Sequence, residues 1–131
     1  MTNENAKLRN LRKHLEGAVV FLASADKRGS PNIITAEVNK VTDDWEIVIT
    51  NNQMFTTIKN LLATKKAAIL FSDHKKIWWR ILGDVKYDLK GKWLKFVQSL
   101  PNNKGYDVKG AVIIKIKKID DLDVGKTILT F

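Results

Sequence analysis

The sequence predicts a mainly β protein, an antiparallel barrel of six strands with two or three helices at its periphery. Six segments of the 131-residue chain have the length and the apolar, β-branched character of strands. Most of them are joined by short turns, and no regular alternation of strand and helix is present, which argues against a doubly wound sheet. The length fits a single domain over residues 1–131 that can bury a core of its own.

The barrel is expected at about residues 18–119, with strands at 18–24, 32–41, 45–50, 67–72, 77–89 and 111–119. The first strand, AVVFLAS, is continuously apolar, so both of its faces are expected to be covered. The fifth contains Gly83, and a glycine within a strand is typical of a β-bulge or of a barrel corner. Trp78 and Trp79 follow one another in that strand, so one is expected inside the barrel and the other outside. The tail at 120–131 has no clear periodicity.

Three helices are predicted around these strands. The first, at about residues 4–16, has Leu8, Leu11 and Leu15 at helical spacing and ends at Gly17. A second is expected from Met54 to Ala63, and a third at 91–100. The N-terminal segment is polar and no apolar run reaches the ~20 residues of a membrane span, so we expect a soluble, cytoplasmic protein with no membrane partner.

Composition removes several classes of function. The chain has no cysteine, and its two histidines lack neighbours at metal-ligand spacing, so no metal site is predicted. Neither a nucleophile motif nor a phosphate-binding glycine loop is present. The net charge of +9 suits an anionic partner, but only four of the 23 basic residues are arginine and the lysines are scattered, which argues against nucleic acid. Any redox chemistry would therefore be supplied by a cofactor.

The segment WEIVITNNQMFTTIKNLLA, residues 45–63, is the most informative part of the chain. Its strand ends at Asn51 and Asn52, and Thr56 and Thr57 fall in the first turn of the following helix. The free N–H groups and partial positive charge of a helix N-terminus suit a phosphate group. The alternative is that these side chains only cap the helix, which is the commoner use of such residues.

The order of these elements resembles the pyridoxamine 5′-phosphate oxidase-like family of flavin-binding split barrels. The resemblance covers about residues 19–119 and rests on the turn A-S-x-D-x-x-G-x-P-N, the helix T-x-x-N-L and the strand R-I-x-G-x-V. It implies a six-stranded antiparallel split β-barrel, and a homodimer with two FMN sites at the subunit interface. The cofactor-binding residues it implies are Thr35, Ala36, Glu37, Thr50, Asn51, Thr56, Thr57, Asn60 and Tyr106.

The resemblance places Thr35, Ala36 and Glu37 beside the flavin, and Thr50 and Asn51 at a strand end next to the ring. Thr56, Thr57 and Asn60 match the phosphate-binding turn, and Tyr106 matches an aromatic side chain contributed by the partner subunit. Family members commonly have Lys or Arg near Thr56, so another flavin or a deazaflavin stays open as the cofactor. Lys59 and Arg80 are the candidate replacements, although a helical Lys59 is expected to point away from Thr56.

Three functions remain open from the sequence, and no catalytic residue is predicted. The first is an FMN-dependent oxidoreductase that acts on a small molecule or receives electrons from a donor. The second is a flavin carrier or electron-transfer protein without a substrate pocket. The third is a basic nucleic-acid-binding barrel, whose binding would depend strongly on salt.

Overall fold

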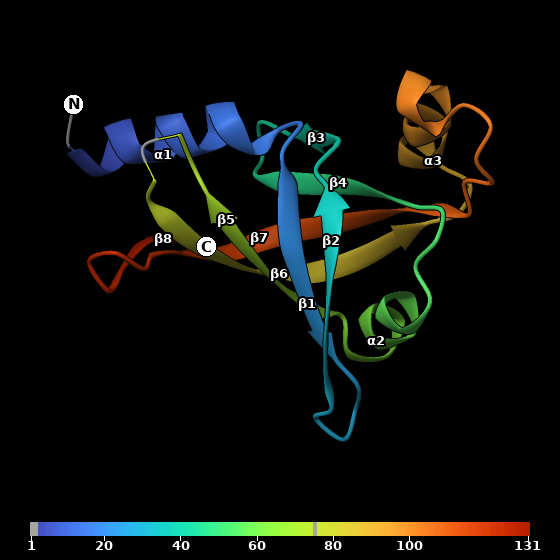
Figure 1. The fold of residues 1–131 in the computed structure, drawn as a ribbon, viewed down its shortest axis with the longest axis horizontal. Helices are drawn as coiled ribbons and strands as arrows, with labels where there is room; N and C mark the ends of the chain where they lie inside the picture. Colours follow the sequence, from blue (N-terminus) through green and yellow to red (C-terminus); the bar gives the residue numbers. More distant parts are fainter. Residues whose placement is uncertain (1–2, 75) are drawn as a thin grey trace.

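The computed structural model describes residues 3–74 and 76–131 (Figure 1). Its helical elements are α1 (Asn3–Leu15), α2 (Thr56–Thr64), α3 (Lys92–Ser99) and the short 3-10 helix η1 (Pro101–Asn103). Its strands are β1 (Val19–Ala25), β2 (Pro31–Glu37), β3 (Lys40–Val41), β4 (Glu46–Asn51), β5 (Lys66–Ser72), β6 (Trp78–Asp88), β7 (Gly110–Asp121) and β8 (Lys126–Thr130). Within the described residues, no helix is long and apolar enough to cross a membrane.

All the strands belong to one antiparallel sheet in the order β2-β1-β5-β6-β7-β4-β3, and β8 pairs with β7. The sheet curls until β2 and β4 contact each other, although β1, β5, β6 and β7 separate them in the order. The fold is therefore an open, mainly β barrel with helices at its periphery, as the sequence predicts (Figure 1).

Gly83 forms the predicted bulge. Leu82 pairs with Lys118 but Gly83 pairs with Ile116, so one residue of β7 is skipped between them. A Cβ at position 83 would lie 2.5 Å from Ile114 Cγ2 and 2.7 Å from the carbonyl oxygen of Lys115. β6 and β7, the two longest strands, can approach this closely because glycine has no side chain at position 83.

The main core fills the inside of the curl. Alternate residues of the strands point inward, among them Val20, Leu22, Ile69 and Ile81, all almost fully buried. α1 lies across one end of the sheet, where Leu11 and Leu15 are fully buried. Each such leucine contributes about 1.5–3 kcal/mol by leaving water. A smaller cluster lies on the other side of β4 and β7, where Val97 of α3 is fully buried.

The residues that the structure describes form eight strands, where the sequence predicts six. The predicted strand at 32–41 is divided into β2 and β3, because the chain changes partner there: Val38 N–H donates to the carbonyl oxygen of Ala18 and Asn39 N–H to that of Val48. The tail, without clear periodicity in sequence, contributes β8, whose side chains are half-buried or exposed. An edge strand of this kind needs no apolar alternation because its pairing with β7 comes from the backbone.

The expectation that both faces of AVVFLAS are covered is wrong for the chain by itself. Val19 and Phe21 have 68% and 43% of their surface exposed, whereas Val20 and Leu22 are buried. The prediction for the tryptophan pair is confirmed, since Trp79 is fully buried and Trp78 is 41% exposed. The outer surface of the sheet is therefore apolar but uncovered along part of its width.

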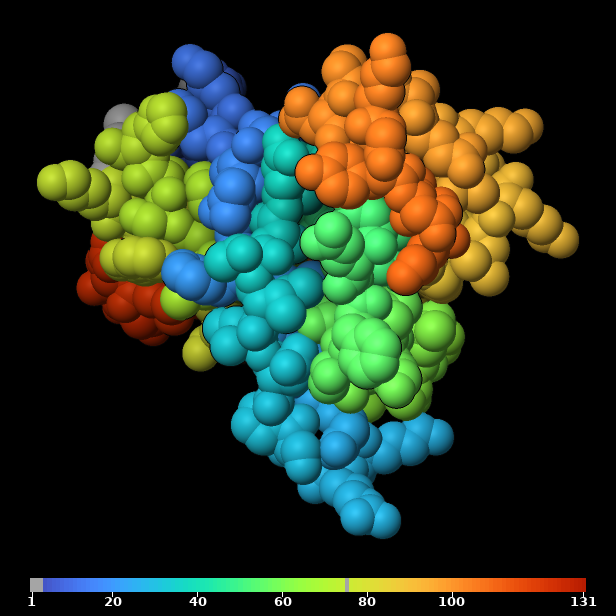
Figure 2. Space-filling model, turned by 45° about the vertical axis from the view of Figure 1, so that its right-hand side comes forward, coloured from blue at the N-terminus to red at the C-terminus, as the bar shows by residue number. Residues whose placement is uncertain are grey.

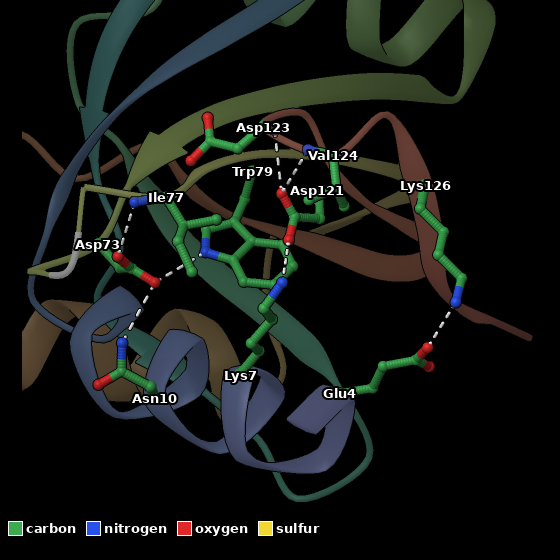
Figure 3. Close-up of polar contacts among 10 residues, drawn as sticks. All are labelled: Glu4, Lys7, Asn10, Asp73, Ile77, Trp79, Asp121, Asp123, Val124 and Lys126. Atoms are coloured by element: carbon green, nitrogen blue, oxygen red, sulfur yellow. Dashed lines mark hydrogen bonds and ion pairs between the residues drawn. The ribbon is translucent and has the colours of Figure 1, made fainter. Parts of the chain in front are cut away.

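Trp79 links the sheet to the N-terminal helix (Figure 3). Its Nε1–H donates to Asp73 Oδ2 at 2.9 Å, and the same oxygen accepts from Asn10 Nδ2 of α1 at 3.2 Å. Nearby, Lys7 of α1 donates to the buried Asp121 at 2.8 Å. These polar contacts satisfy groups that the packing of α1 removes from water.

Candidate functional site

A hollow of about 490 Å³ lies between β2, the segment from β4 to α2, and η1. Figure 2 shows the β2, α2 and α3–η1 regions meeting on this side of the molecule. The residues that line it include Thr35, Ala36, Glu37, Thr50, Thr56 and Thr57, six of the nine predicted for cofactor binding. Curling of the sheet brings them together, because it places β2 against β4.

The two threonines that begin α2 differ in surroundings. Thr56 is exposed, whereas Thr57 is 1% exposed and its Oγ1 accepts a hydrogen bond from Asn32 Nδ2 at 2.8 Å. Asn32 belongs to the A-S-x-D-x-x-G-x-P-N turn, and it also lines the hollow. Thr57 therefore fixes α2 against β2, and Thr56 is the hydroxyl that a ligand can reach.

Among the described residues, no side chain caps the N-terminus of α2. The N-cap residue is Phe55, which makes no side-chain capping hydrogen bond, and the first turn has no acidic residue. Asn51 Oδ1 instead accepts from the N–H of Met54, in the loop before the helix. The capping-only interpretation therefore does not describe this helix, whose first-turn N–H groups are not used by any side chain of the described part of the chain.

α3 provides a contrast within the same molecule. Asp88 accepts hydrogen bonds from the backbone N–H groups of Trp93 and Leu94 in its first turn, and from those of Lys90 and Gly91 before it. The hydrogen bond from Gly91 is the largest cause that lowers the pKa of Asp88 below its ordinary value, and burial opposes it. The N-terminus of α3 is thus neutralised by a carboxylate, whereas that of α2 is left open beside the hollow.

The two candidate cations lie in different places. Lys59 Nζ is 4.7 Å from the ring centroid of Phe55, the residue before Thr56, and Lys59 is not among the residues that line the hollow. The side chain folds back toward the helix N-terminus because the exposed Phe55 ring offers a cation–π contact. Arg80 donates from Nε and Nη2 to Asp120 Oδ2 at 3.0 and 2.9 Å, so it is already paired.

Three of the predicted residues do not line the hollow. Asn51 is buried and donates from Nδ2 to the Tyr87 hydroxyl at 2.7 Å. Asn60 is buried and donates to Ser24 Oγ at 3.1 Å. Tyr106 lies between η1 and β7 with 55% of its surface exposed. Within one chain, the two asparagines hold α2 and its preceding loop in place, and Tyr106 faces solvent.

The end of the hollow away from α2 is built by Asn39, Thr50 and Asn103. Asn39 Oδ1 accepts from Thr50 N–H at 2.9 Å and from Thr50 Oγ1 at 2.7 Å. Asn103 Nδ2 donates to Thr50 Oγ1 at 2.9 Å and to the carbonyl oxygen of Val97 at 2.8 Å. Asn39 and Asn103 were not predicted, because Asn39 falls inside the predicted strand at 32–41 and Asn103 follows the third predicted helix, where asparagine is an ordinary turn residue. Asn32 could have been selected from its place in the turn motif.

A second, larger groove of about 720 Å³ lies on the outer face of the sheet, and none of the nine predicted residues lines it. Its floor crosses β1, β5 and β6, where the register aligns Ala23, Ala68 and Leu82 in one row. Ile33, 62% exposed, extends this row onto β2. The groove is apolar, so it suits a protein surface better than the polar end of a cofactor.

The family model described as pyridoxamine 5′-phosphate oxidase matches residues 9–90, more than half of the chain. The chain belongs to the pyridoxamine 5′-phosphate oxidase family. Residues 9–90, which the family model matches, contain β2, the open first turn of α2 and most of the residues that line the hollow. An uncharacterized protein of Methanocaldococcus jannaschii is 35% identical over 124 residues, which cover 88% of this chain and 83% of that protein.

Solved structures of other proteins share the fold of this member of the pyridoxamine 5′-phosphate oxidase family. HupZ of Group A Streptococcus superposes with a TM-score of 0.80 at 20% identity, covering 91% of this chain and 96% of the other. An FMN-binding protein from Syntrophomonas wolfei superposes with a TM-score of 0.70 at 21% identity, covering 88% and 86%. At these identities the likeness shows the architecture alone.

Proposed function

We propose that this protein binds FMN in the hollow between β2, α2 and η1, and that it is a flavin-dependent oxidoreductase acting on a small molecule. The observation that carries the proposal is the open N-terminus of α2 at one end of a hollow lined by polar side chains. A phosphate group there would accept hydrogen bonds from N–H groups that no described side chain uses.

The residues present fit a phosphorylated flavin. Thr56 offers a hydroxyl in the first turn of α2. Family members commonly have Lys or Arg near this position; here Lys59 supplies a positive charge beside Phe55 instead. Asn32, held by Thr57, adds a polar group on the β2 side. Five residue steps along β2, from Asn32 to Glu37, span roughly 17 Å. The strand is therefore long enough to lie beside an extended planar ligand.

Bound FMN would supply the transfer of a hydride or of single electrons, and the protein would bind and orient it. Thr35, Ala36 and Glu37 would lie along one side of the ring, and Thr50 at its edge. Glu37 is the one charged side chain among the residues that line the hollow, and it lies at the end of β2 opposite Asn32. Its carboxylate is thus placed far from a phosphate that it would repel.

The proposal includes a homodimer. Val19, Phe21, Ile33 and Trp78 are exposed on the outer face of β1, β2 and β6, next to the apolar groove. An apolar surface of this kind is seldom left open on a monomer, and a twofold interface would use it twice. A partner subunit packed here would also bring a second Tyr106 into the assembly, as the family resemblance implies.

Flavin titration tests the cofactor. We expect fluorescence quenching to show FMN binding at least about tenfold more tightly than riboflavin, because a charged hydrogen bond contributes ~1.5–3 kcal/mol. Equal affinities would remove the phosphate from α2. If neither FMN, riboflavin nor a deazaflavin bound, the flavin proposal would fail as a whole.

A second measurement separates an oxidoreductase from an electron carrier. The FMN-loaded protein is reduced anaerobically with dithionite and then mixed with candidate small-molecule acceptors while the flavin absorbance is followed. Saturable reoxidation by a small molecule supports a substrate pocket. Reoxidation by a redox protein, with rates that stay linear in the concentration of every small molecule tried, favours the carrier.

A further inference from the structure

The amide groups of Asn39 and Asn103 have fixed orientations. A backbone N–H only donates, so the Asn39 atom that faces the N–H of Thr50 must be its oxygen. A carbonyl oxygen only accepts, so the Asn103 atom that faces the carbonyl of Val97 must be its nitrogen. The Thr50 hydroxyl agrees with both assignments, because it donates to Asn39 and accepts from Asn103.

Each amide therefore keeps one half unused. Among the described residues, no group accepts a hydrogen bond from Asn39 Nδ2 and none donates one to Asn103 Oδ1. Every fully buried side-chain nitrogen or oxygen of the described residues does have a hydrogen-bond partner. These two atoms are thus not sealed in the core, and both residues line the hollow. The hollow presents a donor and an acceptor on either side of Thr50, at the end away from Thr56.

We infer that Asn39 and Asn103 bind one edge of a planar ring on which a carbonyl oxygen stands beside an N–H, as in a cyclic imide. Asn39 Nδ2 would donate to the carbonyl oxygen, and Asn103 Oδ1 would accept from the ring N–H. The inference rests on the proposed flavin site and deepens it, because the isoalloxazine ring carries such an edge at one end only. The pair would orient the ring with its imide edge at Thr50 and its phosphate chain toward Thr56.

This pairing also makes the site selective. A ligand that lacks the ring N–H would leave Asn103 Oδ1 without a donor after water is excluded, and sites with such unpaired polar groups reject analogues strongly. Thr50 sets the relative position of the two amides, since all three side chains are joined by hydrogen bonds. Asn39 and Asn103 are therefore specificity-determining residues, with Thr50 as their positioning residue.

The test compares the affinity for FMN with the affinity for 3-methyl-FMN, in which a methyl group replaces the hydrogen of the ring N–H. We expect the unmodified protein to bind 3-methyl-FMN at least about tenfold more weakly. In Asn103→Ala, this difference should fall to less than about twofold. Equal affinity for both ligands in the unmodified protein would overturn the inference while leaving FMN binding intact. Absence of binding by either ligand would overturn the proposed function together with it.

Asn39→Asp tests the donor. The variant keeps an oxygen for both hydrogen bonds from Thr50 and replaces the Nδ2 group by a second oxygen, so it should fold while FMN affinity falls at least about tenfold. Asn102→Asp is the matched control, since it adds the same charge to η1 at an exposed position outside the hollow. Equal FMN affinity in a folded Asn39→Asp variant would remove Asn39 from the site. If that variant does not fold, the comparison of FMN with 3-methyl-FMN in the unmodified protein still tests the inference.

Discussion

Thr56 is the position at which the phosphate site can be tested with little risk to the fold. Its side chain is exposed in the first turn of α2, and no hydrogen bond within the described chain depends on it. Thr57 is less suitable, because it is buried and accepts a hydrogen bond from Asn32. A charge at position 57 would be buried, whereas a charge at position 56 stays in solvent. Thr56→Glu and Thr56→Lys therefore form a matched pair.

The expected size of the effect follows from the geometry of one helical turn. A side chain in the first turn and a phosphate bound to the same turn are ~6 Å apart. With about two negative charges on the phosphate, the Glu carboxylate costs FMN binding about 1.4 kcal/mol even at the dielectric constant of water, which is about tenfold in Kd. Thr56→Lys should strengthen FMN binding by about the same factor.

The effect on stability should have the opposite sign. A carboxylate near the N-terminus of α2 stabilises the helix dipole by ~0.3–1 kcal/mol, and a lysine destabilises it by a similar amount. The assays are flavin fluorescence titration and thermal unfolding without ligand, with riboflavin as the ligand control. Thr56→Glu with a raised melting temperature and unchanged FMN affinity would refute the assignment of the phosphate to α2. Equal losses for FMN and riboflavin would point to a distorted hollow.

Three further predictions concern the surfaces and core around the site. Trp78→Lys should give a folded monomer by sedimentation velocity, whereas Trp79→Lys should fail to fold; a Trp78→Lys dimer would exclude the outer face as the interface. Burial raises the pKa of Asp121, but hydrogen bonds from Lys7 and the loop backbone outweigh it and leave the pKa below its ordinary value. This carboxylate therefore adds stability above that ordinary pKa and loses it as the pH falls through the lowered one. Asp121→Asn should lower the melting temperature at neutral pH, with a difference that shrinks in acid; a constant difference would contradict the ionic contribution. Gly83→Ala should destabilise the fold by about 1–3 kcal/mol in denaturant titration, because its Cβ would meet β7, and a neutral result would show that the bulge can relax.

The order of the elements and the first turn of α2 could be predicted from the sequence by itself. Apolar alternation, turn residues and helical spacing are local properties, and they are sufficient to place six strands, the bulge at Gly83 and the second helix, expected from Met54 and observed from Thr56. The opposite orientations of Trp78 and Trp79 follow in the same way, because alternation along a strand does not depend on its neighbours. The family resemblance also follows from the order of short motifs, which a linear chain displays directly.

The tertiary structure decided what these local patterns leave open. Asn51 and Asn60 have the residue type expected at a ligand site, yet packing turns them toward Tyr87 and Ser24. Asn103 has no distinguishing sequence context, and it joins the site only because the curl of the sheet brings η1 against Thr50. The division of the predicted strand at 32–41 has the same origin, since the pairing partner changes from β1 to β4. Which half of an asparagine amide is free depends on long-range hydrogen bonds, and these exist only after the chain has folded.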